Sequence, residues 1–172
     1  FATHSANLYL KNKSDNFYLC SEQIFNKSFI VKDVPPRINW QIAEETKVIE
    51  DKYLCKKAVG EFRGRIYTVW FTEDIPLSFG FFKLEGLYGL ILEAYDNTGE
   101  VQFKLKSISN DSGQLDLSIN DVEMIDWDYY EKLSKEKIKR IKAYLESSTS
   151  DAQIGINVSK IKAIEQSIYE DF

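Results

Sequence analysis

The N-terminal part of the chain alternates apolar and polar residues with a period of about two. The alternation recurs at residues 8–10, 38–42 and 66–71. A period of two is typical of β-strands that bury one face. Ten Tyr, eleven Phe and three Trp favour sheet as well, because flat side chains suit pleated, half-buried surfaces. We therefore predict several strands in this part of the chain.

Short polar segments separate the strand-like runs. Residues 96–99 (Asp, Asn, Thr, Gly) lie between two such runs and predict a hairpin. Residues 63–65 predict a tight turn or a bulge. A further turn at residues 110–113 leads to an alternating run at residues 115–119. The expected arrangement is a succession of antiparallel strands joined by short loops.

After Asp126 the apolar residues follow helical spacing instead. Asp126 and Asp128 are both available as the N-cap of a helix. The polar stretch 147–151 interrupts the pattern, and a second amphipathic segment then runs almost to Phe172. The apolar face of the first helix comprises Tyr130, Leu133, Ile138, Ile141 and Leu145, and that of the second segment Val158, Ile161, Ile164 and Ile168.

These patterns predict an α+β fold that is mostly β, with a curved antiparallel sheet braced by one or two C-terminal helices. A length of 172 residues fits one ordinary globular domain. We expect a single domain over residues 1–172, with a β-rich part at 1–125 and a helical part at 126–172.

Net charge and hydropathy narrow the classes of partner. The formal net charge is −5, which argues against nucleic-acid binding, because such affinity comes from Lys and Arg that neutralise phosphates. No apolar run approaches the roughly eighteen residues that cross a bilayer, so we expect no membrane span.

Two cysteines, Cys20 and Cys55, allow one internal disulfide. Such a bridge would form only in an oxidising compartment and would close a loop of about 35 residues, contributing about 3 to 4 kcal/mol in the chain-entropy model. The alternative is a pair of buried free thiols. Spacing alone does not choose between the two, because it fixes no geometry.

Six short motifs follow one another in the central part of the chain. They occupy residues 40–42, 45–49, 55–58, 62–65, 70–76 and 86–93, and the last begins Gly86, Leu87, Tyr88, Gly89, Leu90, Ile91. Their order and spacing resemble the GLPGLI family of exported bacterial proteins. The resemblance covers the central third to half of the chain.

The GLPGLI resemblance implies a compartment and a kind of partner. It implies a mostly β protein whose signal peptide has been removed, located in the periplasm or at the outer membrane of a Gram-negative envelope. It also implies a TonB-dependent outer-membrane receptor or another envelope protein as partner. The family has no established biochemical activity.

Two departures from the family pattern add aromatic surface. Tyr88 stands where the family usually has Pro, and Gly80-Phe81 stands where it commonly has Gly-Pro. Each change restores a backbone N–H and frees a φ angle. One interpretation is that the rings close one end of the core; the other is an aromatic lip that binds an apolar ligand or a partner strand. The predicted contact residues are Trp70, Phe79, Phe81, Phe82, Leu87 and Tyr88.

The sequence shows no catalytic constellation. The single histidine, His4, lies near a terminus, which disfavours a nucleophile and base built on it. Cys20 and Cys55 lack the neighbouring ligands of a zinc site, so we expect no metal and no cofactor. Carboxylates that could pair for hydrolysis of a glycoside are numerous: Glu44, Glu45, Glu73, Asp74, Glu85 and Glu93.

The favoured hypothesis is a non-enzymatic accessory or binding protein of the cell envelope, which binds an outer-membrane receptor or holds an apolar ligand. Aromatic and small residues in strands, without a matched acid, base and nucleophile, suit binding more than turnover. The alternative is a carboxylate-dependent hydrolase that acts on envelope peptide or glycan. Two facing carboxylates, one with a raised pKa, would favour that alternative.

Overall fold

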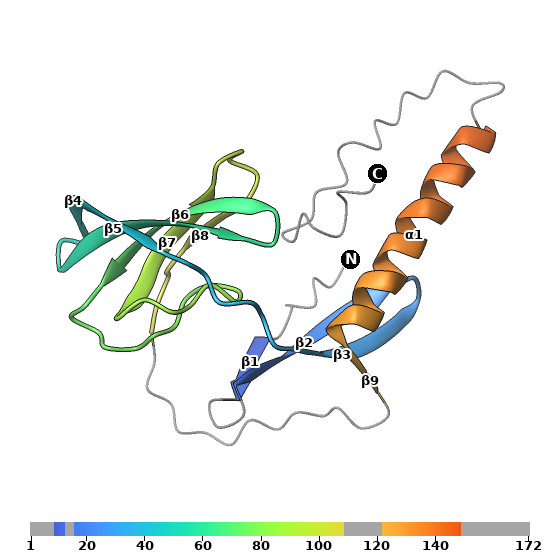
Figure 1. The fold of residues 1–172 in the computed structure, drawn as a ribbon, viewed down its shortest axis with the longest axis horizontal. Helices are drawn as coiled ribbons and strands as arrows, with labels where there is room; N and C mark the ends of the chain where they lie inside the picture. Colours follow the sequence, from blue (N-terminus) through green and yellow to red (C-terminus); the bar gives the residue numbers. More distant parts are fainter. Residues whose placement is uncertain (1–8, 13–15, 109–121, 149–172) are drawn as a thin grey trace. The chain divides into compact units, whose positions relative to one another are not determined.

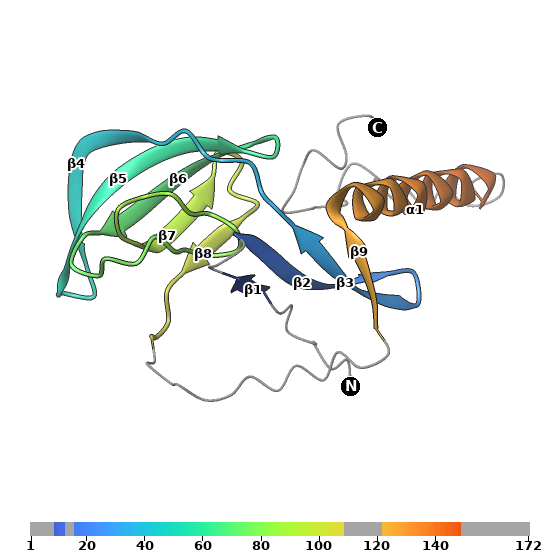
Figure 2. The same cartoon turned by 60° about the horizontal axis from the view of Figure 1, so that its bottom comes forward.

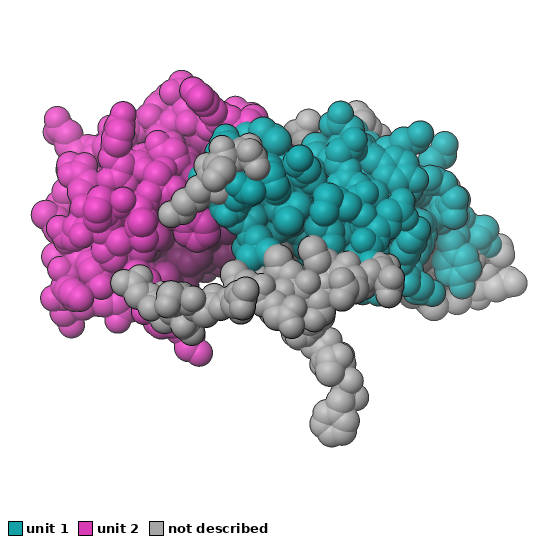
Figure 3. All heavy atoms as spheres, turned by 90° about the horizontal axis from the view of Figure 1, so that it is seen from below, with its two compact units in different colours: residues 1–35, 116–163, 171–172 teal, residues 36–115, 164–170 magenta. Residues whose placement is uncertain are grey.

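Nine strands and one helix make up the part of the chain that the structure describes, which comprises residues 9–12, 16–108 and 122–148 of a computed structural model. These residues divide into two compact units, drawn in teal and magenta in Figure 3. Unit 1 contains the described residues up to 35 and from 122 onward, and unit 2 contains residues 36–108. Each unit has its own buried apolar side chains, and the single domain expected over residues 1–172 stays a prediction.

Unit 1 is built on a four-stranded sheet with the order β1-β2-β3-β9 (Figure 1). The pairs β1–β2 and β2–β3 are antiparallel, and β9 lies parallel to β3, with Val31 opposite Ile125. The helix α1 follows β9 directly and packs against β2, β3 and β9. The elements are β1 Tyr9–Asn12, β2 Phe17–Ile24, β3 Lys27–Asp33, β9 Glu123–Asp126 and α1 Trp127–Ser148.

The helix α1 begins at an aspartate cap. Asp126 Oδ1 accepts a hydrogen bond of 2.8 Å from the backbone N–H of Tyr129, so Asp126 is the N-cap and Asp128 lies in the first turn. Tyr130 and Leu133 pack against the buried cluster of unit 1, as the helical spacing predicted. Among the described residues, no helix is both long and apolar enough to cross a membrane. The predicted second segment, with Val158 to Ile168, lies outside the described residues.

Unit 2 is a five-stranded antiparallel sheet in which each strand pairs with its neighbours along the chain, in the order β4-β5-β6-β7-β8. Figure 2 shows the long strands of this sheet bending along their length. The predicted class, α+β and mostly β with antiparallel sheet, is therefore confirmed. The strands are β4 Gln41–Ile49, β5 Tyr53–Phe62, β6 Arg65–Thr72, β7 Leu90–Asp96 and β8 Gln102–Lys104.

Two of the predicted turns join these strands. Arg63 and Gly64 connect β5 to β6 and both have positive φ, 46° and 77°, as a type I′ hairpin turn requires. The predicted hairpin at residues 96–99 connects β7 to β8, with a hydrogen bond from Gly99 N to Asp96 O of 3.2 Å. The predicted turn at 110–113 and strand at 115–119 lie outside the described residues.

The two faces of the unit 2 sheet carry separate apolar clusters. Along β6, Val69 and Phe71 belong to one cluster, while Trp70 belongs to the other. This division follows from the alternation of side chains along a strand. The segment 73–89, between β6 and β7, folds back over the first face, where Leu84 and Leu87 join Val69 and Phe71 in the cluster.

A buried ion pair fastens the β7–β8 hairpin to the start of β6. The Arg65 guanidinium donates to Asp96 and also forms an ion pair of 3.2 Å with Glu100. Burial by itself would raise the pKa of Asp96. Hydrogen bonds from the Thr98 hydroxyl and from the Val101 N–H, at 3.0 Å, together with the Arg65 charge, outweigh burial and lower that pKa.

Two glycines allow the segment 73–89 to lie against the sheet. A Cβ atom at Gly89 would stand 2.1 Å from the carbonyl oxygen of Thr72, and one at Gly80 would stand 2.5 Å from that of Leu84. Both distances are far inside van der Waals contact with backbone atoms, which cannot move aside as a flexible side chain can. The return of the chain into β7 therefore needs glycine at residue 89.

The Gly89→Ala substitution should lower the free energy of unfolding by about 2 to 3 kcal/mol, the upper part of the usual range for an overpacked site. Urea unfolding followed by the fluorescence of Trp40 and Trp70, both in unit 2, measures the change. Gly99→Ala is the control, because it has a φ of +71° but open space around it, and should lose only about 1 kcal/mol. Equal losses in the two variants would contradict the close approach.

The lowered pKa of Asp96 predicts how stability depends on pH. In the folded protein the pKa of Asp96 lies below its value in the unfolded chain, which is about 3.9. Ionised Asp96 therefore stabilises the folded state above that pH, and this stabilisation is lost as pH falls through the pKa of the folded state. Asp96→Asn should lower stability at pH 7 by about 3 kcal/mol, because the buried Arg65 loses the more deeply buried of its two counter-charges. The loss should shrink toward pH 2. The exposed Asp74→Asn, as control, should leave the stability at pH 7 unchanged.

Candidate functional site

The six predicted contact residues lie in three different environments of unit 2. Trp70 belongs to the cluster on one face of the sheet. Phe81, Phe82 and Leu87 belong to or pack on the cluster of the other face. Phe79 and Tyr88 are exposed on the segment that precedes β7. The structure therefore does not bring all six together into one surface.

Trp70 is buried beneath a lysine. The Nζ atom of Lys47 lies 4.5 Å from the centre of the Trp70 ring, a cation–π contact. Lys47 also forms an ion pair with Glu93, and Glu93 lies directly opposite Trp70 in the β6–β7 register. Lys104 is 3.8 Å from the other carboxylate oxygen of Glu93. The indole ring is thus covered by a charged row and presents little contact surface.

Phe81, Phe82 and Leu87 close the first face of the sheet. Phe81 stacks on Phe103 of β8 with ring centres 5.5 Å apart, and Phe82 meets Phe62 of β5 edge-on at 6.3 Å. Leu87 is buried in the same cluster. These three side chains are positioned as core residues are.

Phe79 and Tyr88, which we call the exposed aromatic pair, are the two predicted residues that present rings to solvent. Tyr88 has 86% of its surface exposed and Phe79 has 40%. They come from two stretches of chain that lie side by side, since Phe79 pairs with Leu90 in a parallel bridge. These two residues are the part of the predicted aromatic lip that is exposed to solvent.

Hydrogen bonds fix the backbone around the exposed aromatic pair. The N–H of Ile91 donates to the Phe79 carbonyl at 3.1 Å, and the N–H of Leu90 donates to the Ile75 carbonyl at 3.1 Å. The N–H of Gly86 donates to the Ser78 hydroxyl at 3.2 Å. Trp40 adds a bond of 2.8 Å from its indole nitrogen to the carbonyl of residue 85. The two exposed rings therefore project from a backbone that is tied down on both sides.

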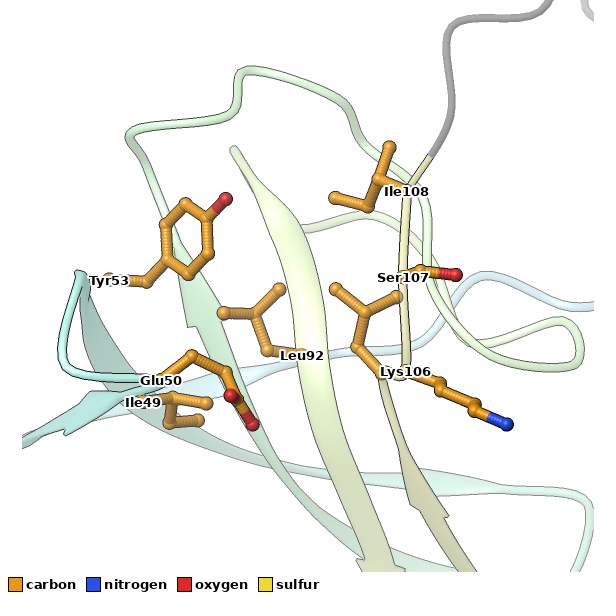
Figure 4. A pocket seen from close by; sticks show the side chains of 8 residues that line it. Ile49, Glu50, Tyr53, Leu92, Lys106, Ser107 and Ile108 are labelled. Atoms are coloured by element: carbon orange, nitrogen blue, oxygen red, sulfur yellow. The ribbon is translucent and has the colours of Figure 1, made fainter.

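Unit 2 also contains a pocket that the sequence did not indicate. Its volume is about 190 Å³, and we call it the Leu92 pocket (Figure 4). None of the six predicted contact residues lines it. Its walls come from the β4–β5 hairpin, from β7 and from the chain that follows β8, and consist of Ile49, Glu50, Tyr53, Leu92, Leu105, Lys106, Ser107 and Ile108.

A β-bulge directs Leu92 to this pocket. Trp70 lies opposite Glu93 and Phe71 lies opposite Ile91, so Leu92 is an extra residue in β7. Leu92 belongs to the same cluster as Trp70, although strict alternation from Glu93 would send it to the other face. The sequence signal was the apolar run from Leu90 to Leu92, which interrupts the alternation just before Glu93.

Glu45, Glu73 and Glu93, which are among the candidate carboxylates, form ion pairs with lysines. Glu45 pairs with Lys57 at 2.8 Å and Glu73 pairs with Lys56 at 2.9 Å, while Glu93 pairs with Lys47. Each of these carboxylates faces a lysine in its ion pair. Such pairs on a sheet surface serve solubility and strand register more than acid-base chemistry.

The two cysteines are buried free thiols, Cys20 in the cluster of unit 1 and Cys55 in unit 2. This is the alternative that spacing left open beside a disulfide. Burial raises the pKa of Cys55 to about 11, although the nearby Lys47 acts in the opposite direction. The Sγ atom of Cys55 lies 3.5 Å from the carbonyl oxygen of Tyr53. A thiol in this state is a poor nucleophile.

Cys55 should therefore react very slowly with Ellman's reagent in the native protein. With a pKa of about 11, about one thiol in a thousand is ionised at pH 8. The Cys20→Ala variant isolates Cys55, and we expect it to react only after denaturation. Wild type denatured without reductant should release two thiols per chain. Release of no thiols from the denatured wild type would instead indicate a disulfide between Cys20 and Cys55.

The comparisons with known proteins indicate a fold but no family. No family model matches the chain, no curated protein matches it, and the GLPGLI resemblance stays a prediction. Two structures of PNGF-II, in space groups C2 and P21, match with TM-scores of 0.50 and 0.51 at 20% identity. The match covers 77% of this chain and 25% of PNGF-II. The chain is thus similar in fold to about a quarter of PNGF-II, and at this identity the likeness extends to the fold alone.

Proposed function

We propose that this chain is a non-enzymatic binding protein of the bacterial cell envelope, and that it contacts a partner protein through Phe79 and Tyr88. The observation that carries the proposal is the presentation of Tyr88, 86% exposed, from a hydrogen-bonded backbone. An isolated surface ring needs no explanation, but two rings on adjacent, fixed stretches of chain form a small contact surface.

The physical advantage of this arrangement lies in the entropy of binding. A tyrosine side chain has two torsion angles, so little rotamer freedom is lost when its ring is buried by a partner. The backbone bonds at Leu90 and Ile91 already hold the segment, so little backbone freedom is lost either. Tyrosine is also among the residues that most often dominate interface energies.

The compartment and the class of partner come from the GLPGLI resemblance. It supports an exported protein in the periplasm or at the outer membrane, with a TonB-dependent receptor or another envelope protein as partner. Tyr88 lies within the motif at residues 86–93, at a position where the family usually has Pro, and Phe79 lies between that motif and the one at residues 70–76. The proposed partner therefore comes from the resemblance, and the proposed contact surface comes from this chain's own residues.

The hydrolase alternative receives no support from the carboxylate that is most deeply buried in unit 2. That alternative called for facing carboxylates, one of which has a raised pKa. Asp96 instead has a lowered pKa and bonds to Arg65, Thr98 and Val101, which is the chemistry of a structural ion pair. We therefore place binding ahead of turnover.

A pull-down from the native envelope in mild detergent tests the proposal. The tagged full-length protein should recover an outer-membrane receptor, and the Phe79→Ser/Tyr88→Ser variant should recover at least about tenfold less of it, because truncating two interface anchors commonly costs that much affinity or more. Mass spectrometry with isotope-labelled cells gives the ratio directly.

The chain provides a matched control for that experiment. Phe25 and Tyr144 are also one Phe and one Tyr, with 45% and 70% exposed, but they lie in unit 1. The Phe25→Ser/Tyr144→Ser variant should recover the receptor as wild type does. Equal recovery by wild type and the Phe79/Tyr88 variant would remove the exposed aromatic pair from the interface and overturn the proposal.

A further inference from the structure

The Leu92 pocket has the size of a small ring compound. Its volume of about 190 Å³ lies somewhat above the roughly 150 Å³ of an apolar protein cavity that takes up benzene. It is well below the roughly 300 to 1,000 Å³ of sites that hold drug-sized ligands. By this comparison the pocket accommodates about seven to nine non-hydrogen atoms.

The lining of the pocket combines apolar side chains with polar groups in about equal measure. Figure 4 shows the side chains of Tyr53, Leu92 and Ile108 around one opening, with those of Lys106 and Ser107 pointing away from it. Leu92 belongs to a buried cluster against which Tyr53 and Leu105 pack. Ile108 is nevertheless 47% exposed, so an apolar ligand in the opening would cover surface that now faces water.

Features of the backbone fix the positions of these walls. The bulge in β7 directs Leu92 to the pocket, and the N–H of Leu105 donates to the Leu92 carbonyl at 2.8 Å. On the other side, Glu50 and Asp51 both have positive φ, 54° and 50°, in the turn between β4 and β5. Two consecutive residues of positive φ are typical of a tight hairpin turn, as in the turn between β5 and β6, so this wall is fixed by the turn. The pocket is therefore preformed.

The polar groups around the pocket favour an uncharged ligand with one hydrogen-bonding group. Glu50 and Lys106 carry opposite charges and line the same pocket, so a charged ligand attracted by one would be repelled by the other. The Tyr53 hydroxyl accepts a hydrogen bond of 3.2 Å from Lys52 Nζ, and a hydroxyl in that state can still donate its own hydrogen.

We infer that the Leu92 pocket is a binding site for a compact, neutral ring compound of the phenol type, whose ring contacts Leu92, Leu105 and Ile108 and whose polar substituent bonds to the Tyr53 hydroxyl. The site is separate from Phe79 and Tyr88, and it gives unit 2 a small-molecule ligand in addition to the proposed protein partner. The two proposals stand or fall independently.

A titration of the ¹⁵N-labelled full chain with p-cresol, followed by amide chemical shifts, tests the inference. We expect saturable shifts at residues 49–53, 92 and 105–108, with a dissociation constant of roughly 0.1 to 1 mM, the range for a fragment of about eight non-hydrogen atoms. The larger 2-naphthol should bind at least tenfold more weakly because it exceeds the pocket. Tighter binding of 2-naphthol would show that the pocket does not select its ligand by size and would overturn the inference.

Two variants assign the ligand to the pocket. Ile108→Trp places a larger side chain at the opening and should weaken p-cresol binding at least tenfold. Val48→Trp is its matched control, because Val48 is an exposed apolar residue of β4 that does not line the pocket, and it should leave binding unchanged. Equal binding of p-cresol by the Ile108→Trp variant and wild type would overturn the inference.

Removing a single oxygen tests the polar contact without the risk of misfolding. Tyr53→Phe should weaken binding of p-cresol about three- to tenfold and that of toluene less than twofold, because toluene has no group to bond. Tyr95→Phe, on β7 but outside the pocket, should bind both compounds as wild type does. An equal effect of Tyr53→Phe on the two compounds, or no effect on either, would overturn the assignment of the hydroxyl.

The Phe79→Ser/Tyr88→Ser variant should bind p-cresol normally, so failure of the partner proposal is distinguishable from failure of this one.

Discussion

The backbone of Gly89 lies so close to the carbonyl of Thr72 that no side chain fits between them, and much of unit 2 depends on that contact. It brings the end of the segment 73–89 back to the point where β6 ended, so that β7 begins beside it. Leu84 and Leu87 can then close one face of the sheet, while Tyr88, next to the glycine, projects outward. The same constraint thus completes the core and positions the proposed contact surface.

The sheet of unit 2 separates two kinds of surface by the alternation of its strands. One face is filled by aromatic and aliphatic side chains from the returning segment. The other carries the ion-paired row around Trp70 and, at its end, the Leu92 pocket. The bulge in β7 decides where the second face changes from charged to apolar, because it directs both Leu92 and Glu93 to that side. A local irregularity of one residue therefore creates the pocket.

Charged groups in this unit chiefly hold strands together. Arg65 and Asp96 are buried where the β7–β8 hairpin meets the start of β6, and the bonds to Thr98, Glu100 and Val101 satisfy both charges. Because one buried charge without the other would be strongly destabilising, the pair defines a single way for the hairpin to dock. Against this stable frame, an exposed ring pair and a small pocket are both available for binding.

The sequence by itself predicted the strand at residues 66–71, a tight turn or bulge at residues 63–65, the hairpin at residues 96–99 and the helix that starts after Asp126, because periodicity, turn residues and caps act over a few positions. It also identified the segment 79–88 as rich in aromatic residues. Tertiary structure alone decided that Phe81 and Phe82 pack inward while Phe79 and Tyr88 remain exposed, because burial depends on which strands lie opposite. It alone assembled the Leu92 pocket, whose lining residues extend from Ile49 to Ile108 and meet only through the pairing of successive strands in one sheet.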